Sequence, residues 1–284
     1  MWFLFSLSSA FADSIKDVFA KKSAIHIDEY VAAWSQRIFG LVILVPLMLW
    51  FWPKTLDATF WHALIIVIFF ASIASVWYMK ALKYSPLSVV LPIASLTPVF
   101  ILVTSHFVNH ELPSVLGIVG VCIAVIGAYV LQWSKRTQGF FTPFTHLVTD
   151  KGSRYMLGVA LLWSITSPYD KVAIQHSNTF FYVGIASILY TLILLPPMFT
   201  KGRFRSLIKN VKILAPIGFG QVLAIIFQML AVPLTFVSYV TAVKRSSSIF
   251  APLWGKVFFN EEKIKERLLG TVIILIGIVL MILS

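Results

Sequence analysis

The sequence of 284 residues is 59% hydrophobic and only 12% charged, with a formal net charge of +12, and its mean hydropathy is +0.89. These values exclude a disordered chain, a collagen-like chain and an ordinary soluble enzyme, and they indicate a protein that crosses a membrane several times. The single cysteine, Cys122, excludes an intrachain disulfide framework and a multi-cysteine zinc or iron–sulfur site.

Apolar segments long enough to cross a bilayer follow one another along almost the whole chain. A helix needs about 20 apolar residues to span the hydrocarbon core. Ten segments fit: roughly 2–20, 30–52, 60–81, 86–107, 113–133, 155–174, 179–199, 212–231, 235–259 and 267–283. The first is the weakest because it holds Asp13, Lys16 and Asp17, and its lack of a basic start argues against a signal peptide. The sequence therefore predicts an all-α integral membrane protein with ten transmembrane helices.

Basic residues divide very unequally between the two ends of the expected spans. If the loops alternate between two sides, 16 of the 23 lysine and arginine residues fall on one side, and only Lys54 and Lys171 fall on the other. Lysine and arginine collect in the cytoplasmic loops of membrane proteins. We therefore expect a multi-pass protein of the cell (inner) membrane whose two termini both face away from the cytoplasm.

A spacing of 150 residues relates the two halves of the chain. The pattern E-x8-G-x6-G, which starts at Glu111, recurs at Glu261 and opens the last expected span of each half. An odd number of spans per repeat requires that the two copies insert with opposite topology, an arrangement found in transporters that bind their substrate between the halves. We expect two inverted five-helix repeats, residues 1–133 and 155–284, joined by a cytoplasmic linker, residues 134–154.

The same residues resemble a known family. A-L-K-Y-S-P starts at Ala81 and is followed by a span broken by Pro92 and Pro98, by N-H-E-L-P and by the G-x6-G pair, while Y-V-T-A-V-K-R-S-S (239–247) and F-F-N-E-E (258–262) look like a second copy. These segments resemble EamA repeats of the drug/metabolite transporter superfamily. The resemblance implies a secondary carrier, and not an enzyme, in which two inverted repeats surround a central cavity and export or exchange a small metabolite.

Lys244 and Arg245 lie near the middle of the ninth expected span. A charge at the centre of a membrane helix costs about 2.5–3.5 kcal/mol on the insertion scale and marks a functional site by default. We expect one or both side chains to line a hydrated cavity and bind an anionic group. The resemblance implies the same, because basic residues bind anions at a similar place in the branch of the drug/metabolite transporter superfamily that exchanges sugar phosphates. The alternative is pairing with a buried acid such as Asp17 or Asp170, or extension to the membrane surface.

Three more charged residues in the expected spans are candidates for ion coupling or for an ion pair. Asp17 and Asp170 end the first span of each half, where they could take a proton or bind an amine. The simpler interpretation, which we favour, pairs them with their neighbours Lys16 and Lys171. Arg37, in the second span, either extends to the cytoplasmic edge or pairs with an acid of the first span.

Other residues are candidates for a helix cap, a gate or a pocket wall. Glu111 and Glu261 start the last helix of each half, where an acid is ordinary capping chemistry, and gating is the alternative. Pro98 and Pro168 free carbonyl groups within spans, and these groups either line the cavity or only accompany a kink. The expected aromatic and hydroxyl walls of the substrate pocket are Trp77, Trp163, Ser95, Ser164, Ser167, Ser238 and Tyr239.

The sequence therefore predicts a secondary transporter that moves a small, anionic or zwitterionic metabolite by alternating access. We expect it to lie in the lipid bilayer as a monomer or homodimer, without nucleic acid, metal ion or cofactor. The alternative is a flippase or scramblase of a lipid-linked glycan or another amphipathic lipid, which would show a lateral opening between helices. An intramembrane enzyme is disfavoured because none of the six histidines pairs at i,i+4 within a span.

Overall fold

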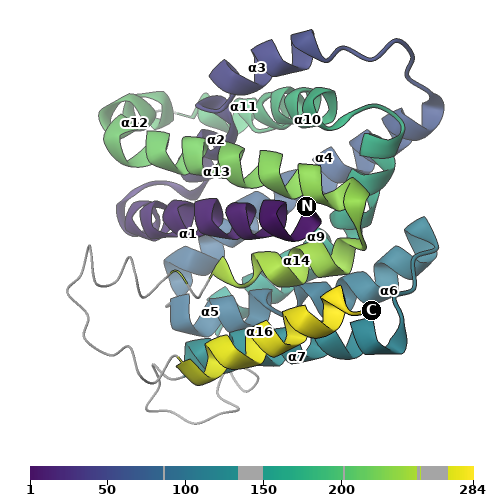
Figure 1. The fold of residues 1–284 in the computed structure, drawn as a ribbon. Coiled ribbons are helices and arrows are strands. Elements are labelled where there is room, and N and C mark those ends of the chain that lie inside the picture. The colour runs from purple at the N-terminus through teal and green to yellow at the C-terminus, as the bar shows by residue number, and fades with distance from the viewer. Residues whose placement is uncertain (86, 134–149, 201, 248–249, 251–267) are drawn as a thin grey trace.

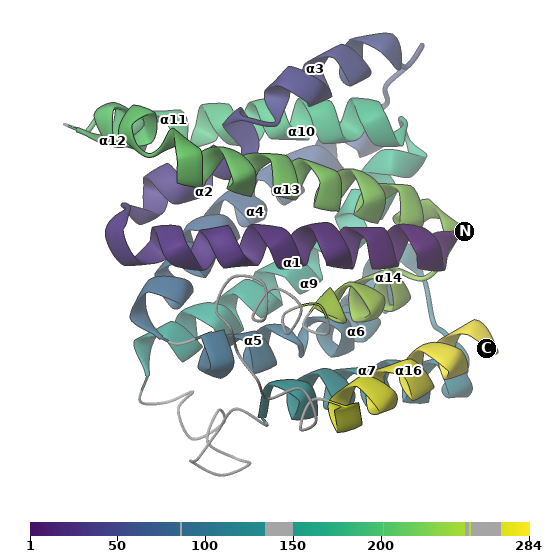
Figure 2. The same ribbon diagram turned by 60° about the vertical axis from the view of Figure 1, so that its left-hand side comes forward.

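The computed structural model describes residues 1–85, 87–133, 150–200, 202–247, 250 and 268–284, and the regular structure of these residues is helical. The long helices lie side by side, and both termini lie at the same end of the molecule (Figures 1 and 2). The first half contains α1 (Trp2–His26), α2 (Glu29–Ile38), α3 (Leu41–Trp50), α4 (Ala58–Tyr84), α5 (Leu87–Ala94), α6 (Thr97–Asn109) and α7 (Val115–Trp133). The second half contains α9 (Lys151–Gln175), α10 (Thr179–Ile193), α11 (Leu195–Met198), α12 (Arg203–Lys209), α13 (Val211–Ala231), the 3₁₀ turn η1 (Val232–Leu234), α14 (Val237–Lys244) and α16 (Leu268–Ile282).

The all-α prediction is confirmed for the described residues, but the count of ten spans is not. Four helical segments are long and apolar enough to cross a membrane by length and composition: Glu29–Trp50, Ala58–Tyr84, Val89–Asn109 and Val211–Leu234. Val115–Val130, Thr179–Ile193 and Leu269–Ile282 are apolar but shorter. Helices α1 and α9 have 25 residues each but carry several charges. Residues 251–259 of the ninth expected span lie outside the described residues.

Three of the expected continuous spans are divided in the structure. The fourth, 86–107, separates into α5 and α6 just before Pro98, which has no N–H to donate to the carbonyl oxygen of Ala94. The hydroxyl of Thr97 donates to that oxygen instead, at 2.6 Å, so the acceptor keeps a partner at the break. The second span divides into α2 and α3, and the seventh into α10 and α11.

The break between α2 and α3 coincides with a close approach to α13. A Cβ atom at Gly40 would lie 1.8 Å from Cγ2 of Val222, and a Cβ atom at Gly218 would lie 2.6 Å from the carbonyl oxygen of Ser35. These two glycines remove the side-chain atoms that would otherwise hold the two backbones apart. The end of α2 and the residues that follow it therefore pack closely against α13.

The packing of the helices follows a two-fold pattern. The three most extensively packed pairs are α7 with α16, α4 with α9, and α1 with α13. Helix α4 is the third long segment of the first half, and it packs against α9, the first segment of the second half. In the same way, α13 is the third long segment of the second half, and it packs against α1, the first segment of the first half. Exchange of the two halves therefore converts the α4–α9 pair into the α13–α1 pair and returns α7–α16 to itself.

The same pattern extends to individual hydrogen bonds. The ammonium group of Lys171, at the end of α9, donates to the carbonyl oxygen of Thr235 at 2.7 Å. Lys21, 150 residues earlier, donates to the carbonyl oxygens of Leu82 at 2.7 Å and of Ser85 at 3.3 Å. Since Ser85 precedes Thr235 by the same 150 residues, a lysine near the end of the first helix contacts the residue after the third long segment in both halves.

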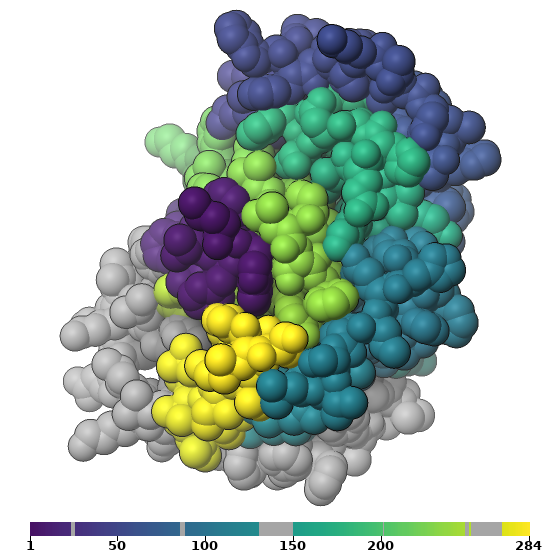
Figure 3. Space-filling view, turned by 45° about the vertical axis from the view of Figure 1, so that its right-hand side comes forward, coloured from purple at the N-terminus to yellow at the C-terminus, as the bar shows by residue number. Residues whose placement is uncertain are grey.

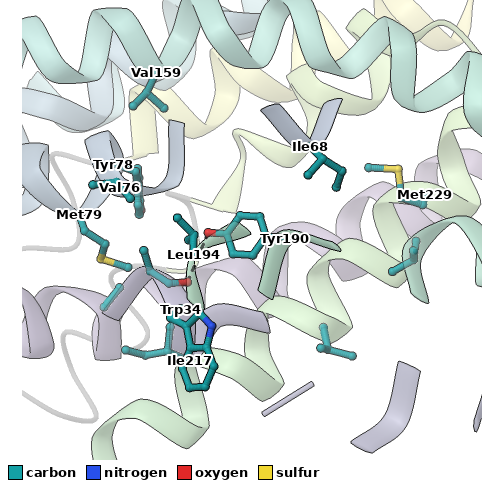
Figure 4. Close-up of a cluster of buried hydrophobic side chains, with 14 of the residues drawn as sticks. Trp34, Ile68, Val76, Tyr78, Met79, Val159, Tyr190, Leu194, Ile217 and Met229 are labelled. Carbon is teal, nitrogen blue, oxygen red and sulfur yellow. Dashed lines mark hydrogen bonds between the residues drawn. The ribbon is translucent and has the colours of Figure 1, made fainter. Parts of the chain in front are cut away.

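A buried apolar core joins α2, α4, α9, α10 and α13. Figure 4 shows part of it, with Trp34 of α2, Tyr190 of α10 and Ile217 of α13 among the side chains drawn. The indole N–H of Trp34 donates to the carbonyl oxygen of Thr191 at 2.9 Å, and the hydroxyl of Tyr190 donates to that of Ala33 at 3.3 Å. These bonds satisfy the polar atoms of two large aromatic residues inside the apolar core.

A second, smaller core lies between α7, α14 and α16, at the end where the termini meet. Its members include Tyr239 and Met281, and Trp2 and Phe3 of α1 pack against it. Figure 3 shows the start of α1 (purple) beside the end of α16 (yellow) on this side of the molecule. This core anchors the first and last helices to each other.

Candidate functional site

A cavity of about 130 Å³ lies between the helices of the two halves. It has room for several water molecules, and its wall is strongly polar for the interior of an apolar protein. The charged and polar residues that line it are Asp13, Lys16, Gln36, Arg37, Ser75, Tyr78, Thr97, Thr166, Ser167, Asp170, Tyr182, Tyr190, Gln221, Gln228, Thr241, Lys244 and Arg245. Four of these side chains are basic and two are acidic, so the wall carries an excess of positive formal charge.

Helix α1 contributes a compact charge cluster to this wall. The ammonium group of Lys16 lies 2.5 Å from Oδ1 of Asp13 and 3.4 Å from Oδ1 of Asp17. The hydroxyl of Tyr78, from α4, donates to Asp17 at 2.7 Å. Asp17 therefore pairs with its neighbour Lys16, as we favoured from the sequence, and it does not itself line the cavity.

Lys244 lies at the end of α14 and lines the cavity, as predicted. Its ammonium group donates to Oε1 of Gln228 at 2.7 Å and lies 3.6 Å from Oδ2 of Asp13. The expected alternatives for an acidic partner were Asp17 and Asp170, but the acid that approaches Lys244 is Asp13. Because the ion pair is long and the closer partner is a neutral amide, the positive charge of Lys244 is only partly balanced by the protein.

Arg245 follows directly and also lines the cavity. Its Nη2 atom donates to the hydroxyl of Thr97 at 3.1 Å, and its guanidinium carbon lies 5.0 Å from the ring centroid of Trp163. The stacking on the indole ring is a cation–π contact. The break before Pro98 thus has a consequence for the cavity, since the same Thr97 hydroxyl bonds the freed carbonyl of Ala94 and accepts from Arg245.

Arg37 reaches the cavity from α2. Its guanidinium carbon lies 5.1 Å from the ring centroid of Tyr190. The sequence suggested that Arg37 extends to the cytoplasmic edge or pairs with an acid of the first span. The structure shows neither, since Arg37 lines the cavity and no Asp or Glu oxygen of the described residues lies within 4.0 Å of its nitrogen atoms.

Asp170 is buried on α9 and lines the cavity. It accepts a hydrogen bond from the hydroxyl of Tyr182, on α10. The suggested pairing of Asp170 with Lys171 is not found, because the side chain of Lys171 turns to Glu111. Asp170 therefore gives the cavity an acidic group whose neighbour is a tyrosine hydroxyl.

Four of the nine side chains expected to bind substrate line the cavity: Lys244, Arg245, Trp163 and Ser167. The other five face elsewhere. Ser95 and Ser164 donate to the carbonyl oxygens of Leu91 and Leu161 in their own helices. Trp77 packs against Gly158 and Tyr155. Ser238 is buried outside the cavity wall. The hydroxyl of Tyr239 lies 2.7 Å from Oγ of Ser284.

Glu111 does not cap the helix that it precedes. That role belongs to Ser114, whose hydroxyl accepts from the backbone N–H of Gly117 at 3.1 Å. The carboxylate of Glu111 pairs with Lys171 and accepts from the backbone N–H of Val237, the first residue of α14, at 3.4 Å. Glu111 thus links its own half to two helices of the other half, while its repeat mate Glu261 lies outside the described residues.

The structure adds polar residues that the sequence analysis did not select. Gln221 and Gln228 of α13 and Tyr182 of α10 are examples. The spacing of seven residues between the two glutamines was an available signal, because residues two turns apart in an apolar helix share one face. Within the described ranges, no three His, Cys, Asp or Glu side chains are placed to hold a metal ion.

The chain matches known proteins along its whole length. The model of the EamA-like transporter family matches residues 1–133 and again 150–283. A protein of Archaeoglobus fulgidus that is named an uncharacterized transporter is 23% identical over 304 residues, which cover 99% of this chain and 97% of that protein. A solved crystal structure of another protein has the same fold, with a TM-score of 0.71, 15% identity and coverage of 99% of this chain and 96% of that one.

Proposed function

The chain belongs to the EamA-like transporter family of the drug/metabolite transporter superfamily, and we propose that it is a secondary transporter that moves a small anionic or zwitterionic metabolite across the cell membrane by alternating access. Residues 1–133 and 155–284 are the two inverted repeats of this proposal, and residues 134–154 are their cytoplasmic linker. The excess of basic residues at one set of loops supports an orientation with both termini away from the cytoplasm.

The observation that carries the proposal is the charged cavity between the two halves. Four basic and two acidic side chains line it, although each charge within a membrane is costly unless water, a counter-charge or a ligand solvates it. Replacement of buried charged groups by well-packed apolar residues is often neutral or stabilising, so folding alone does not require charges at these positions. Retention of an excess of positive charge favours a site for an anionic group.

Lys244 and Arg245 are the proposed substrate-binding cations of the second half. Lys244 contributes a point charge, while the guanidinium of Arg245 is already oriented by Thr97 and Trp163 and is suited to a carboxylate or a phosphate. Ser167 and Trp163 complete the nearby wall. A substrate bound here would contact helices of both repeats, which is what alternating access between two halves requires.

The pair Glu111–Lys171 is the proposed gate at the end that holds the termini. Lys171 comes from the second half and Glu111 from the first, and both also contact the segment that leads into α14. Since α14 carries Lys244, a change in this network would be transmitted to the cavity through one short helix. Opening of this end would separate the two residues.

The test begins with the purified full-length protein. A panel of anionic metabolites is screened for thermal stabilisation, because a ligand that binds the folded state raises its stability by RT ln(1 + [L]/Kd). Uptake of the best ligand into proteoliposomes is then compared for the wild type, Lys244→Ala, Arg245→Ala and Arg245→Lys. Lys83→Gln is the matched control because it removes a positive charge that pairs with Glu29 and does not line the cavity.

We expect the alanine variants to fold and to lose transport, and Arg245→Lys to fail as well, because an ammonium group cannot reproduce the fork of a guanidinium. The control should transport normally. Normal transport by both alanine variants would show that Lys244 and Arg245 are structural. Stabilisation by a lipid-linked glycan, and by no soluble anion, would instead favour the flippase alternative.

A further inference from the structure

Arg37 lies where α2 packs closely against α13, and no ion pair among the described residues holds its guanidinium group. Arg37 lies in the last turn of α2, the turn that is held against α13 by the close contacts of Gly40 with Val222 and of Gly218 with Ser35. Its guanidinium carbon stacks over the ring of Tyr190, 5.1 Å from the centroid. The charged group therefore reaches the cavity from a closely packed part of the fold.

Two of the three guanidinium nitrogen atoms of Arg37 lack hydrogen-bond acceptors among the described residues. Its Nε and Nη1 atoms are buried and have no hydrogen-bond partner among the described residues. The same is true of Nε2 of Gln36, the preceding residue, which also lines the cavity. A buried donor without an acceptor costs more than a satisfied hydrogen bond gains, and the cost is greater for a charged group.

The other cations of the cavity wall each have an oxygen partner. The ammonium group of Lys16 lies 2.5 Å from Asp13, that of Lys244 lies 2.7 Å from Gln228, and Nη2 of Arg245 lies 3.1 Å from Thr97. Arg37 is thus the cavity cation that the described protein atoms compensate least. Lys244 and Arg245 stood out in the sequence because they lie near the middle of an expected span, but the geometry gives Arg37 the greater need for an external acceptor.

We infer that Arg37, together with the side-chain amide of Gln36, binds an oxyanion group, either a carboxylate or a phosphate, inside the cavity. The inference rests on the proposed function in one respect, namely that this cavity holds the substrate. It adds an anion-binding position that is supplied by the first half of the chain, whereas Lys244 and Arg245 are supplied by the second half. A guanidinium is the side chain best suited to an oxyanion, because its planar donors match the geometry of such groups.

The experiment measures anion binding directly, so that its result does not depend on transport. Thermal unfolding of the purified full-length protein is followed with inorganic phosphate and with acetate, each compared with chloride at equal ionic strength. The variants are Arg37→Gln, Arg37→Lys and Gln36→Leu, with Lys83→Gln as the control for the loss of a positive charge outside the cavity. Gln36→Leu also tests the site without a change of net charge.

At least one of the two oxyanions should raise the melting temperature of the wild type and of the control. Arg37→Gln should lose this shift, with binding weakened by about tenfold or more, as expected for the loss of hydrogen bonds from a charged group. Arg37→Lys should keep part of the shift, and Gln36→Leu should reduce it. Without added oxyanion, Arg37→Gln should unfold at the same temperature as the wild type or higher, because it removes buried donors that have no acceptor.

Two results would overturn the inference: an unchanged oxyanion response in Arg37→Gln, or no response of the wild type to either probe. A purely structural arginine would give a variant that is less stable without the oxyanion and that still responds to it. Loss of the response in Arg37→Gln together with normal transport by the Lys244 and Arg245 variants would support Arg37 while rejecting the roles proposed for those two residues. If the oxyanion response does not depend on Arg37 but the wild type transports an anionic metabolite, the inference about Arg37 is wrong and the proposed function still stands.

Discussion

Gly120 of α7 and Gly277 of α16 lie in direct contact where these two helices cross. A Cβ atom at Gly120 would lie 2.8 Å from the carbonyl oxygen of Gly277, and a Cβ atom at Gly277 would lie 2.6 Å from that of Gly120. Two helical turns further along α7, a Cβ atom at Gly127 would lie 3.0 Å from the carbonyl oxygen of Gly270. The helices therefore run antiparallel, with the glycines of one G-x6-G pattern against those of the other.

This crossing explains why the glycine pattern occurs twice. Addition of 150 to Gly120 and Gly127 gives Gly270 and Gly277, so the exchange of the two halves converts one glycine contact into the other. Such a contact is possible only if the two helices point in opposite directions. The spacing that indicated a repeat in the sequence is thus the contact surface between the two copies.

The first prediction concerns this surface. Gly120→Ala and Gly277→Ala should each lower the free energy of unfolding by about 1–3 kcal/mol, because the new methyl group meets backbone atoms that cannot move independently. Thermal unfolding of the purified variants measures the effect. Val119→Ile is the matched control, since its added methylene lies on an exposed side of the same helix. The double variant should lose less than the sum of the single losses, because both methyl groups act on one contact. Two fully additive losses would argue against a shared crossing point.

The second prediction concerns the link between the halves at Glu111. Glu111→Gln or Lys171→Met should each destabilise the protein by about 3 kcal/mol, because each leaves a largely buried partner uncompensated. The double variant should recover part of that loss, and the four proteins together form a double-mutant cycle. Melting temperatures give the stability, and the proposed gate also predicts leakier transport. A coupling energy near zero would show that the Glu111–Lys171 pair does not stabilise the contact between the two halves.

The third prediction separates two threonines that satisfy backbone carbonyls next to prolines. Thr97 donates to Ala94, four residues before Pro98, and Thr104 donates at 2.6 Å to Ser164, four residues before Pro168. Thr97→Val and Thr104→Val should each cost about 1–2 kcal/mol of stability, because each leaves an acceptor without its donor.

The two threonine variants should differ in function. Only Thr97 lines the cavity and holds Arg245, so Thr97→Val should also weaken binding of the anionic substrate, while Thr104→Val should bind it normally. Binding isotherms of the purified variants measure this difference. Equal loss of binding in both would mean that the effect comes from general destabilisation.

The fourth prediction concerns orientation in the membrane. Thr55, in the connection between α3 and α4, and Lys209, in α12, are exposed. Figure 1 shows that connection and α12 at opposite ends of the molecule, with the connection at the end that holds both termini. In a Cys122→Ala background, single cysteines at these positions should react oppositely with a membrane-impermeant thiol reagent. Thr55→Cys should be labelled in intact cells and Lys209→Cys only after lysis, because the basic loops stay in the cytoplasm. Labelling of Lys209→Cys from outside would reverse the orientation.

Composition and periodicity determined the class of this protein. The apolar runs predicted helices, because the bilayer forces the backbone to satisfy its hydrogen bonds within each segment, but they did not predict where three of the expected spans divide. The cost of placing charges in such a segment likewise identified Lys244 and Arg245, and both line the cavity. The glycine spacing indicated the repeat, since only small residues allow two backbones to approach so closely.

Contacts between helices decided the rest. Ser95, Ser164 and Tyr239 were plausible pocket residues by type, but the rotation of their helices turned them toward carbonyl groups or a second core. Glu111 had the position of a cap and instead reaches across to Lys171. Arg37 had two ordinary explanations in the sequence, and its lack of acceptors became visible only once the neighbouring helices were in place. The direction of a side chain around a helix, and the partner that it meets there, depend on packing between segments far apart in the chain, which local sequence does not encode.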